Sequence, residues 1–265
     1  MAPNVDYLAH LARESARFAE VIAEVPPAAR VPSCPGWSAD DLLWHLGEVQ
    51  WFWGTIAREG LTREQAEQRK PPRPAGRAAL LAFYRHASRD LSEVLAAVPA
   101  TAPAWTWSED HTVGFIRRRQ AHEALIHRVD AELAAGGRSP MDPQLSADGV
   151  DEVLRIMYGG DLPEWGTFTS GSGTALRLQA TDTGQSWLVT MGQFTGTDPA
   201  DQASYDQPGI LVTSAPGTGA AASVRGNAAD LDCWLWRRPS LMPVERSGDP
   251  DLLSAFDAMI APGIT

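Results

Sequence analysis

The stretch RRRQAHEALIHRVDAE, residues 117–132, places two histidines and a glutamate in what its apolar spacing predicts to be an amphipathic helix. Histidine nitrogens and glutamate oxygens are common zinc ligands. On an α-helix, residues four apart differ by about 40° and can bind one ion, whereas residues five apart differ by about 140°. Glu123 and His127 therefore suit one metal ion, and His122 and His127 do not. The two histidines of the zinc-protease motif HExxH are four residues apart, whereas those of this stretch are five apart, so the motif is absent.

A third ligand has to come from another part of the chain, and His45 is the candidate. It lies between Leu42 and Val49 on the apolar face of a second predicted helix, where an unpaired imidazole would be costly to bury. Two histidines and one glutamate leave one zinc coordination position open. That is the arrangement of catalytic zinc sites, whereas structural sites are closed by a fourth protein ligand.

The residues by themselves leave other interpretations open. A histidine in an apolar stripe is often a core residue bonded to a carbonyl group. Phe115, His122 and Ile126 form the centre of the apolar stripe on the fourth predicted helix, which contains the 117–132 stretch, so helical geometry also allows His122 to be the inward residue. Cys34, close to His45 in the chain, has the chemistry of a nucleophile or a fourth ligand, although a small buried hydrophobic side chain is its more common role.

The elements that carry these residues are helices. Apolar spacing predicts one from Asn4, as its cap, to about Val25, and a second that begins after the break VPSCPGW with Ser38 and Asp41 as an acidic capping box. A third runs from about Ala75 to Val98, and the 117–132 stretch is the fourth. Helices of this length joined by proline-rich loops predict an antiparallel four-helix bundle.

Beyond a predicted linker at 134–144, the apolar period changes to two. Strands are predicted around 176–180, 187–191 and 210–212, followed by short helices at 228–236, capped by Asn227, and at 249–260. This half is predicted to be α+β with a mostly antiparallel sheet. We therefore expect two domains, residues 1–138 and 145–265.

Composition narrows the classes of partner. The 265 residues carry a net charge of −11, which argues against nucleic acid and anionic membrane surfaces as partners. No apolar run approaches the length of a membrane span, and the N-terminal residues do not resemble an export signal. Two cysteines fit a reducing compartment. We expect a cytoplasmic protein that acts on small molecules as a monomer or weak homodimer.

Three stretches resemble the mycothiol-dependent maleylpyruvate isomerase family. VPSCPGWSADDLLWHLGEV and RRRQAHEALIHRVDAE are similar to its two N-terminal signatures, and GNAADLDCWLWRRPSLMPVERSGDPDLLSAF is similar to its C-terminal domain, where a DLxxWLWGR and a GD pattern recur. The resemblance implies a DinB-like four-helix bundle followed by a domain like sterol carrier protein 2. It also implies a zinc ion held by His45, Glu123 and His127. A catalytic arginine of the family best matches Arg238, with Arg237 in place of the pattern's glycine.

The implied activity is zinc-dependent use of the thiol of mycothiol. A thiol has a pKa of about 8.5, and coordination to a metal deprotonates it at neutral pH. Addition of the thiolate to a small electrophilic alkene, rotation and elimination would isomerise the alkene, and addition or displacement alone would be S-transfer. Arg238 would bind a carboxylate or a developing enolate. The alternative is a non-catalytic protein that binds a small ligand, with a structural metal or none.

Overall fold

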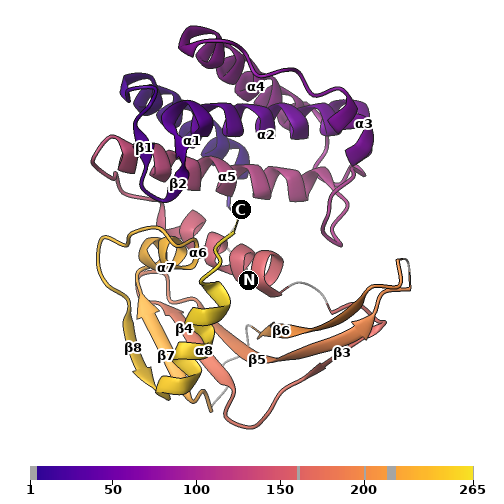
Figure 1. Ribbon diagram of the computed structural model, residues 1–265, viewed down its shortest axis with the longest axis vertical. Helices are drawn as coiled ribbons and strands as arrows, with labels where there is room; N and C mark the ends of the chain where they lie inside the picture. The colour runs from indigo at the N-terminus through magenta and orange to yellow at the C-terminus, as the bar shows by residue number, and fades with distance from the viewer. Residues whose placement is uncertain (1–4, 160–161, 200, 214–218, 265) are drawn as a thin grey trace. The chain divides into compact units, whose positions relative to one another are not determined.

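The computed structural model describes residues 5–159, 162–199, 201–213 and 219–264. The chain folds as two compact units, Met1–Pro140 and Met141–Thr265 (Figure 1). The first is helical and the second contains a sheet, which confirms the predicted fold class. Within the described ranges, no helix has both the length and the hydropathy to span a membrane.

Four long helices form the first unit. They are α1 (Tyr7–Glu24), α2 (Ala39–Glu59), α4 (Arg77–Ala97) and α5 (Val113–Ala134), and a short α3 (Arg63–Gln68) follows α2. Both α1 and α2 pack against α4 and against α5. The long helices therefore follow one another around the bundle in the order α1, α5, α2, α4 (Figure 1). This order makes α2 and α5 neighbours, and these are the two helices that carry the candidate ligands.

Local capping sets the helix limits. The predicted capping box of α2 is confirmed, because the Ser38 hydroxyl accepts from the Asp41 amide and the Asp41 carboxylate accepts from the Ser38 amide. The predicted cap Asn4 lies outside the described residues. Asp6 caps α1 by accepting a hydrogen bond from the Ala9 amide, and Thr112 caps α5 in the same way. The fourth helix therefore begins before the predicted residue 117.

A hairpin that the sequence did not predict precedes α2. Strands β1 (Arg30–Val31) and β2 (Cys34–Ser38) pair antiparallel within the segment expected to be only a break. Ser38 ends β2 and caps α2, so the hairpin runs directly into that helix. The main-chain bond from the Ala39 amide to the Ala29 carbonyl closes its base. Strand β1 packs against α5, and the Ser33 hydroxyl in the hairpin's turn donates to Asp130 of that helix.

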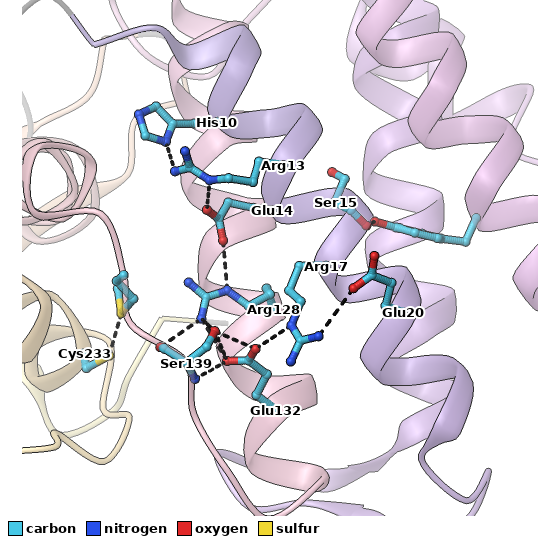
Figure 2. A network of polar contacts seen from close by, with 12 residues as sticks. His10, Arg13, Glu14, Ser15, Arg17, Glu20, Arg128, Glu132, Ser139 and Cys233 are labelled. Carbon is cyan, nitrogen blue, oxygen red and sulfur yellow. Dashed lines mark hydrogen bonds and ion pairs between the residues drawn. The ribbon is translucent and has the colours of Figure 1, made fainter.

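Helix α5 buries charged side chains as well as apolar ones. Arg128 is fully buried, and its guanidinium donates to Glu14 and to Glu132 over 2.8 Å each (Figure 2). Glu132 also accepts from Arg17 and from both the amide and the hydroxyl of Ser139. Each charge in this network meets an opposite charge and hydrogen-bond donors or acceptors. That pairing is what makes burial of ions tolerable.

The second unit is built on a mixed sheet. Its strands are β3 (Gly166–Thr169), β4 (Ala175–Ala180), β5 (Ser186–Thr197), β6 (Ser204–Thr213), β7 (Ala222–Gly226) and β8 (Glu245–Gly248). Strands β4 and β3 pair with successive halves of β5 along one of its edges, and β6 pairs along the other edge. Strand β7 pairs with the free edge of β4, and β8 pairs with β7. Only the β4–β7 pairing is parallel among the described strands, so the prediction of a mostly antiparallel sheet is confirmed.

Helices complete the second unit. They are α6 (Pro143–Glu152), which continues into the π-helical segment η1 (Val153–Gly159), then α7 (Ala228–Leu235) and α8 (Pro250–Ile260). The predicted Asn227 cap of α7 is confirmed. Helices α6 and α7 pack closely because Gly149 has no side chain: a Cβ there would lie 2.7 Å from an oxygen of Asp232.

The buried network predicts a large effect of Glu132→Gln on the stability of the first unit. The variant leaves the buried Arg128 with only one of its two counter-charges, Glu14, so the free energy of unfolding should fall by about 2 kcal/mol. Urea unfolding measures the change. Glu20→Gln is the control, because Glu20 is an exposed partner of Arg17, and it should change stability by less than about 0.5 kcal/mol.

The pH dependence of stability in wild type and Glu132→Gln tests whether the negative charge of Glu132 stabilises the first unit. Burial alone would raise the pKa of Glu132, but hydrogen bonds from Ser139 and Arg128 lower it to about 2 from an ordinary 4.5. Its contribution is complete above about pH 4.5 and is lost as the pH falls towards 2. The stability difference between wild type and Glu132→Gln should therefore shrink over that range. A difference that does not change with pH would contradict this role of the carboxylate.

Candidate metal centre

Side chains from α2 and α5 meet at one point of the first unit. His45 Nε2 lies 3.4 Å from Glu123 Oε1, and His127 Nε2 lies 3.1 Å from the same oxygen. The imidazole rings of the two histidines are 4.9 Å apart and nearly perpendicular. Among the described residues, these three form a group whose ligand atoms all lie within 4.8 Å of one another. The structure thus brings together the three side chains that the sequence analysis singled out as candidate ligands.

The local geometry follows from the helices. Glu123 and His127 lie one turn apart on α5 and so project from the same face. His45 reaches them because α2 packs directly against α5. The side chains of His45, Glu123 and His127 are 29%, 16% and 9% exposed, so the group is accessible on the His45 side. The indole of Trp37, from the hairpin, lies 4.6 Å from the His45 ring and borders that side.

A buried arginine keeps the glutamate ionised. Burial by itself would raise the pKa of Glu123, but the Arg119 guanidinium and hydrogen bonds from His127 and His45 hold it well below its usual range. Arg119 donates to Glu123 Oε2 over 2.5 Å, which leaves Oε1 facing the two histidines. The carboxylate is thus held as an anion with one oxygen directed at the site.

His127 has a second carboxylate behind it. Its Nδ1 lies 2.9 Å from Asp130 Oδ2, while its Nε2 faces Glu123. Burial would lower the pKa of His127, but hydrogen bonds to Asp130 and Glu123 raise it to about 9. A cation bound at Nε2 would take the place of a proton there, as metal binding to imidazole requires.

The donor set fits a small divalent cation. Two imidazole nitrogens and one carboxylate oxygen converge from two packed helices, and each ligand on α5 has a further hydrogen bond that orients it. His122 is buried elsewhere, beside the ring of Tyr7 at 6.3 Å, and is not part of the group. Cys34 lies with its sulfur 3.8 Å from Asp130 and is not part of it either.

Sequence reasoning missed three side chains that shape this centre: Arg119, Asp130 and Ser33. A signal existed for the first two, because Arg119 is four residues before Glu123 and Asp130 is three residues after His127. These are spacings at which helical side chains pair. Ser33 donates to Asp130 across 97 positions of the chain, and spacing holds no signal for that contact.

The fourth predicted site residue, Arg238, belongs to the second unit. Its side chain is buried, donates to the Trp236 carbonyl over 2.7 Å and lies 5.7 Å from the Trp236 ring centre. It follows α7, which ends in a Schellman motif: the Arg238 amide donates to the Cys233 carbonyl and the Arg237 amide to that of Trp234. Arg237 therefore has a left-handed backbone, with φ at +61°.

Comparison with known proteins decides the family. The family model of the mycothiol maleylpyruvate isomerase N-terminal domain matches residues 8–132, and that of the C-terminal domain matches residues 144–255. The chain belongs to the mycothiol-dependent maleylpyruvate isomerase family. It is accordingly an enzyme of an isomerase family. Comparison with curated protein sequences gives no match.

Solved structures share the fold. A crystal structure of the mycothiol-dependent maleylpyruvate isomerase is 15% identical, with a TM-score of 0.58, over 92% of this chain and 93% of that one. A crystal structure of a histidine-to-alanine mutant of the isomerase is 14% identical, with a TM-score of 0.60 over the same shares. At these identities the likeness establishes the common fold of both units.

Residues of the family's C-terminal DLxxWLWGR and GD patterns have structural roles in this chain. The Asp230 carboxylate accepts from the amides of Leu241 and Met242 and so holds the loop after α7. In the GD pair, Gly248 has φ at +97°, and a Cβ there would lie 2.3 Å from the Ala221 carbonyl. Asp249 caps α8. These residues shape the backbone on either side of the turn that carries Arg238.

The left-handed position predicts that Arg237→Gly stabilises the second unit. The family pattern has glycine here because glycine adopts positive φ without the steric cost that Arg237 pays. The gain should be about 1 kcal/mol, measured as a higher urea midpoint. Arg225→Gly, in strand β7, is the control and should destabilise, because glycine weakens a strand. A lower midpoint for Arg237→Gly would contradict a steric cost of the side chain at this turn.

Proposed function

We propose that this chain is a zinc-dependent enzyme that activates the thiol of mycothiol for isomerisation of, or S-transfer to, a small electrophilic substrate. One observation carries the proposal: His45, Glu123 and His127 bring two nitrogens and an oxygen within 4.8 Å of one another at an accessible point. Family membership supports mycothiol as the thiol, and the isomerases of known structure share the fold. Three protein ligands leave a coordination position for an exchangeable partner.

A zinc ion at this point would supply a Lewis acid that keeps a small thiol in its thiolate form at neutral pH. The chain's own residues prepare for it. Glu123 contributes one negative charge, held ionised by Arg119, and the two imidazoles contribute none when they act as ligands. The ligand set therefore leaves the cation a net positive charge with which to stabilise sulfur.

The accessible side of the group indicates where a thiol approaches. His127 is the most buried of the three ligands and His45 the least. Trp37, packed against His45, offers an aromatic wall on that side. A thiol would therefore enter next to His45, with Trp37 excluding water from one face of the reacting atoms.

The reaction balances without an oxidant or a reductant. In isomerisation, the thiolate sulfur forms a bond to one carbon of an activated cis alkene, the resulting single bond rotates, and elimination breaks the carbon–sulfur bond and returns the thiolate. In S-transfer, the new bond persists and either a proton is added at the neighbouring carbon or a leaving group departs with its electron pair. We propose that Arg238 binds the carboxylate or enolate that this chemistry presents, because a guanidinium donates two parallel hydrogen bonds.

Metal content tests the proposal first. Elemental mass spectrometry should find about one zinc ion per chain in the purified protein. The substitution His45→Ala should lower zinc affinity, because it removes one of the three proposed ligands. His86→Ala is the control, because His86 is an exposed histidine of α4. Stoichiometric binding of a small ligand that survives His45→Ala, without turnover, would instead favour the non-catalytic alternative.

Turnover tests the reaction. With maleylpyruvate as the first substrate, activity should require mycothiol and should disappear on chelation and return with zinc. Arg238→Lys keeps the charge but loses the paired donors, so kcat/KM should fall by about 100-fold. Arg225→Lys, at an exposed arginine of β7, should retain full activity. Thiol-independent activity, or full activity after exhaustive chelation, would overturn the proposal.

A further inference from the structure

The ring of His127 is held from both sides. Its Nε2 faces Glu123 and His45, and its Nδ1 lies 2.9 Å from an oxygen of Asp130. Asp130 is fully buried one turn further along α5. A carboxylate on the far nitrogen of a metal-binding histidine accepts the remaining N–H, which fixes the tautomer and the ring orientation.

The carboxylate is itself anchored from another part of the chain. The Ser33 hydroxyl donates to Asp130 Oδ1 over 2.5 Å, and the Cys34 sulfur lies 3.8 Å from Oδ2, the oxygen that faces His127. Both residues belong to the β1–β2 hairpin, 97 and 96 positions away. Because Ser33 holds one oxygen, rotation of the carboxylate is restricted and the other oxygen stays directed at His127.

The same hairpin touches the other histidine directly. The Trp37 ring lies 4.6 Å from that of His45 and 6.2 Å from that of His127. The nine-residue segment Arg30–Ser38 is therefore linked to both imidazoles. It packs directly on His45 through Trp37, and it reaches His127 through the hydrogen bond of Ser33 to Asp130. A contact made at two independent points suits a positioning role better than a chance surface pair does.

We propose that Asp130, anchored by Ser33, is a positioning residue that fixes His127 with Nδ1 protonated and Nε2 directed at the bound cation. The inference rests on the proposed zinc site and deepens it. Asp130 acts only through His127 and does not touch the cation. The β1–β2 hairpin is thereby part of the metal centre although it contributes no ligand.

Zinc affinity measured by chelator competition tests the inference. Asp130→Asn keeps the shape but loses the charge that orients the N–H, and it should weaken zinc binding by about 10- to 100-fold. Ser33→Ala removes only the anchor and should weaken binding about fivefold, the worth of one ordinary hydrogen bond. Asp230→Asn is the matched control: it removes a buried carboxylate of the second unit, and zinc affinity should not change.

A spectroscopic signal separates positioning from a general loss of structure. In the zinc-loaded protein, the Nδ1 proton of His127 should give a downfield resonance that exchanges slowly with water. This resonance should move upfield in Asp130→Asn and stay in place in Asp230→Asn. Zinc binding by Asp130→Asn and Ser33→Ala within twofold of wild type would overturn the inference and leave the zinc site standing. Failure of the wild-type protein to bind zinc would overturn both.

Discussion

The candidate centre depends on the packing of α2 against α5 along one stretch of the bundle. That packing places Glu123 Oε1 between the Nε2 atoms of His45 and His127, at 3.4 and 3.1 Å. It follows from the order of the helices around the bundle, α1, α5, α2, α4, in which α5 has neighbours on two sides. A helix enclosed in this way can present ligands from a rigid backbone, which holds them more accurately than a loop does.

Burying so much of α5 has a cost, because the helix carries Arg119, Arg128 and Asp130 inside the unit. Each of these charges meets an opposite charge: Arg119 meets Glu123, Arg128 meets Glu14 and Glu132, and Asp130 meets His127. Paired burial costs far less than isolated burial. The pairs on Glu123 and His127 also orient these two candidate ligands, so the same ion pairs serve the fold and the candidate centre.

Features set by local chemistry were predictable from the sequence. Ser38 and Asp41 mark the start of α2, Asn227 marks that of α7, and period-two spacing located β4. The i, i+4 rule allowed Glu123 and His127 to share one ion and excluded His122 and His127 as a pair, and the structure places His122 outside the group. Family resemblance, which the domain models bear out, was needed to prefer a metal site over a core histidine. The roles of the three ligands and of Arg238 stay predictions.

Features set by long-range contacts were not predictable. Two prolines in the Val31–Ser38 segment indicated a break, and the hairpin exists there because it pairs with itself and packs beside α5. The link from Ser33 to Asp130 joins positions 97 apart, which no local pattern encodes. At Arg237 the family resemblance already indicated that a glycine is missing. The physical reason, a left-handed backbone at this position, is visible only in the structure.

The most direct test of the central claim is zinc X-ray absorption on the purified protein, with and without mycothiol. We expect the zinc ion to have two imidazole nitrogens and one carboxylate oxygen as neighbours at about 2.0–2.2 Å, and a new sulfur neighbour at about 2.3 Å once mycothiol is added. A first shell with fewer than two imidazoles, or one that gains no sulfur at saturating mycothiol, would contradict it.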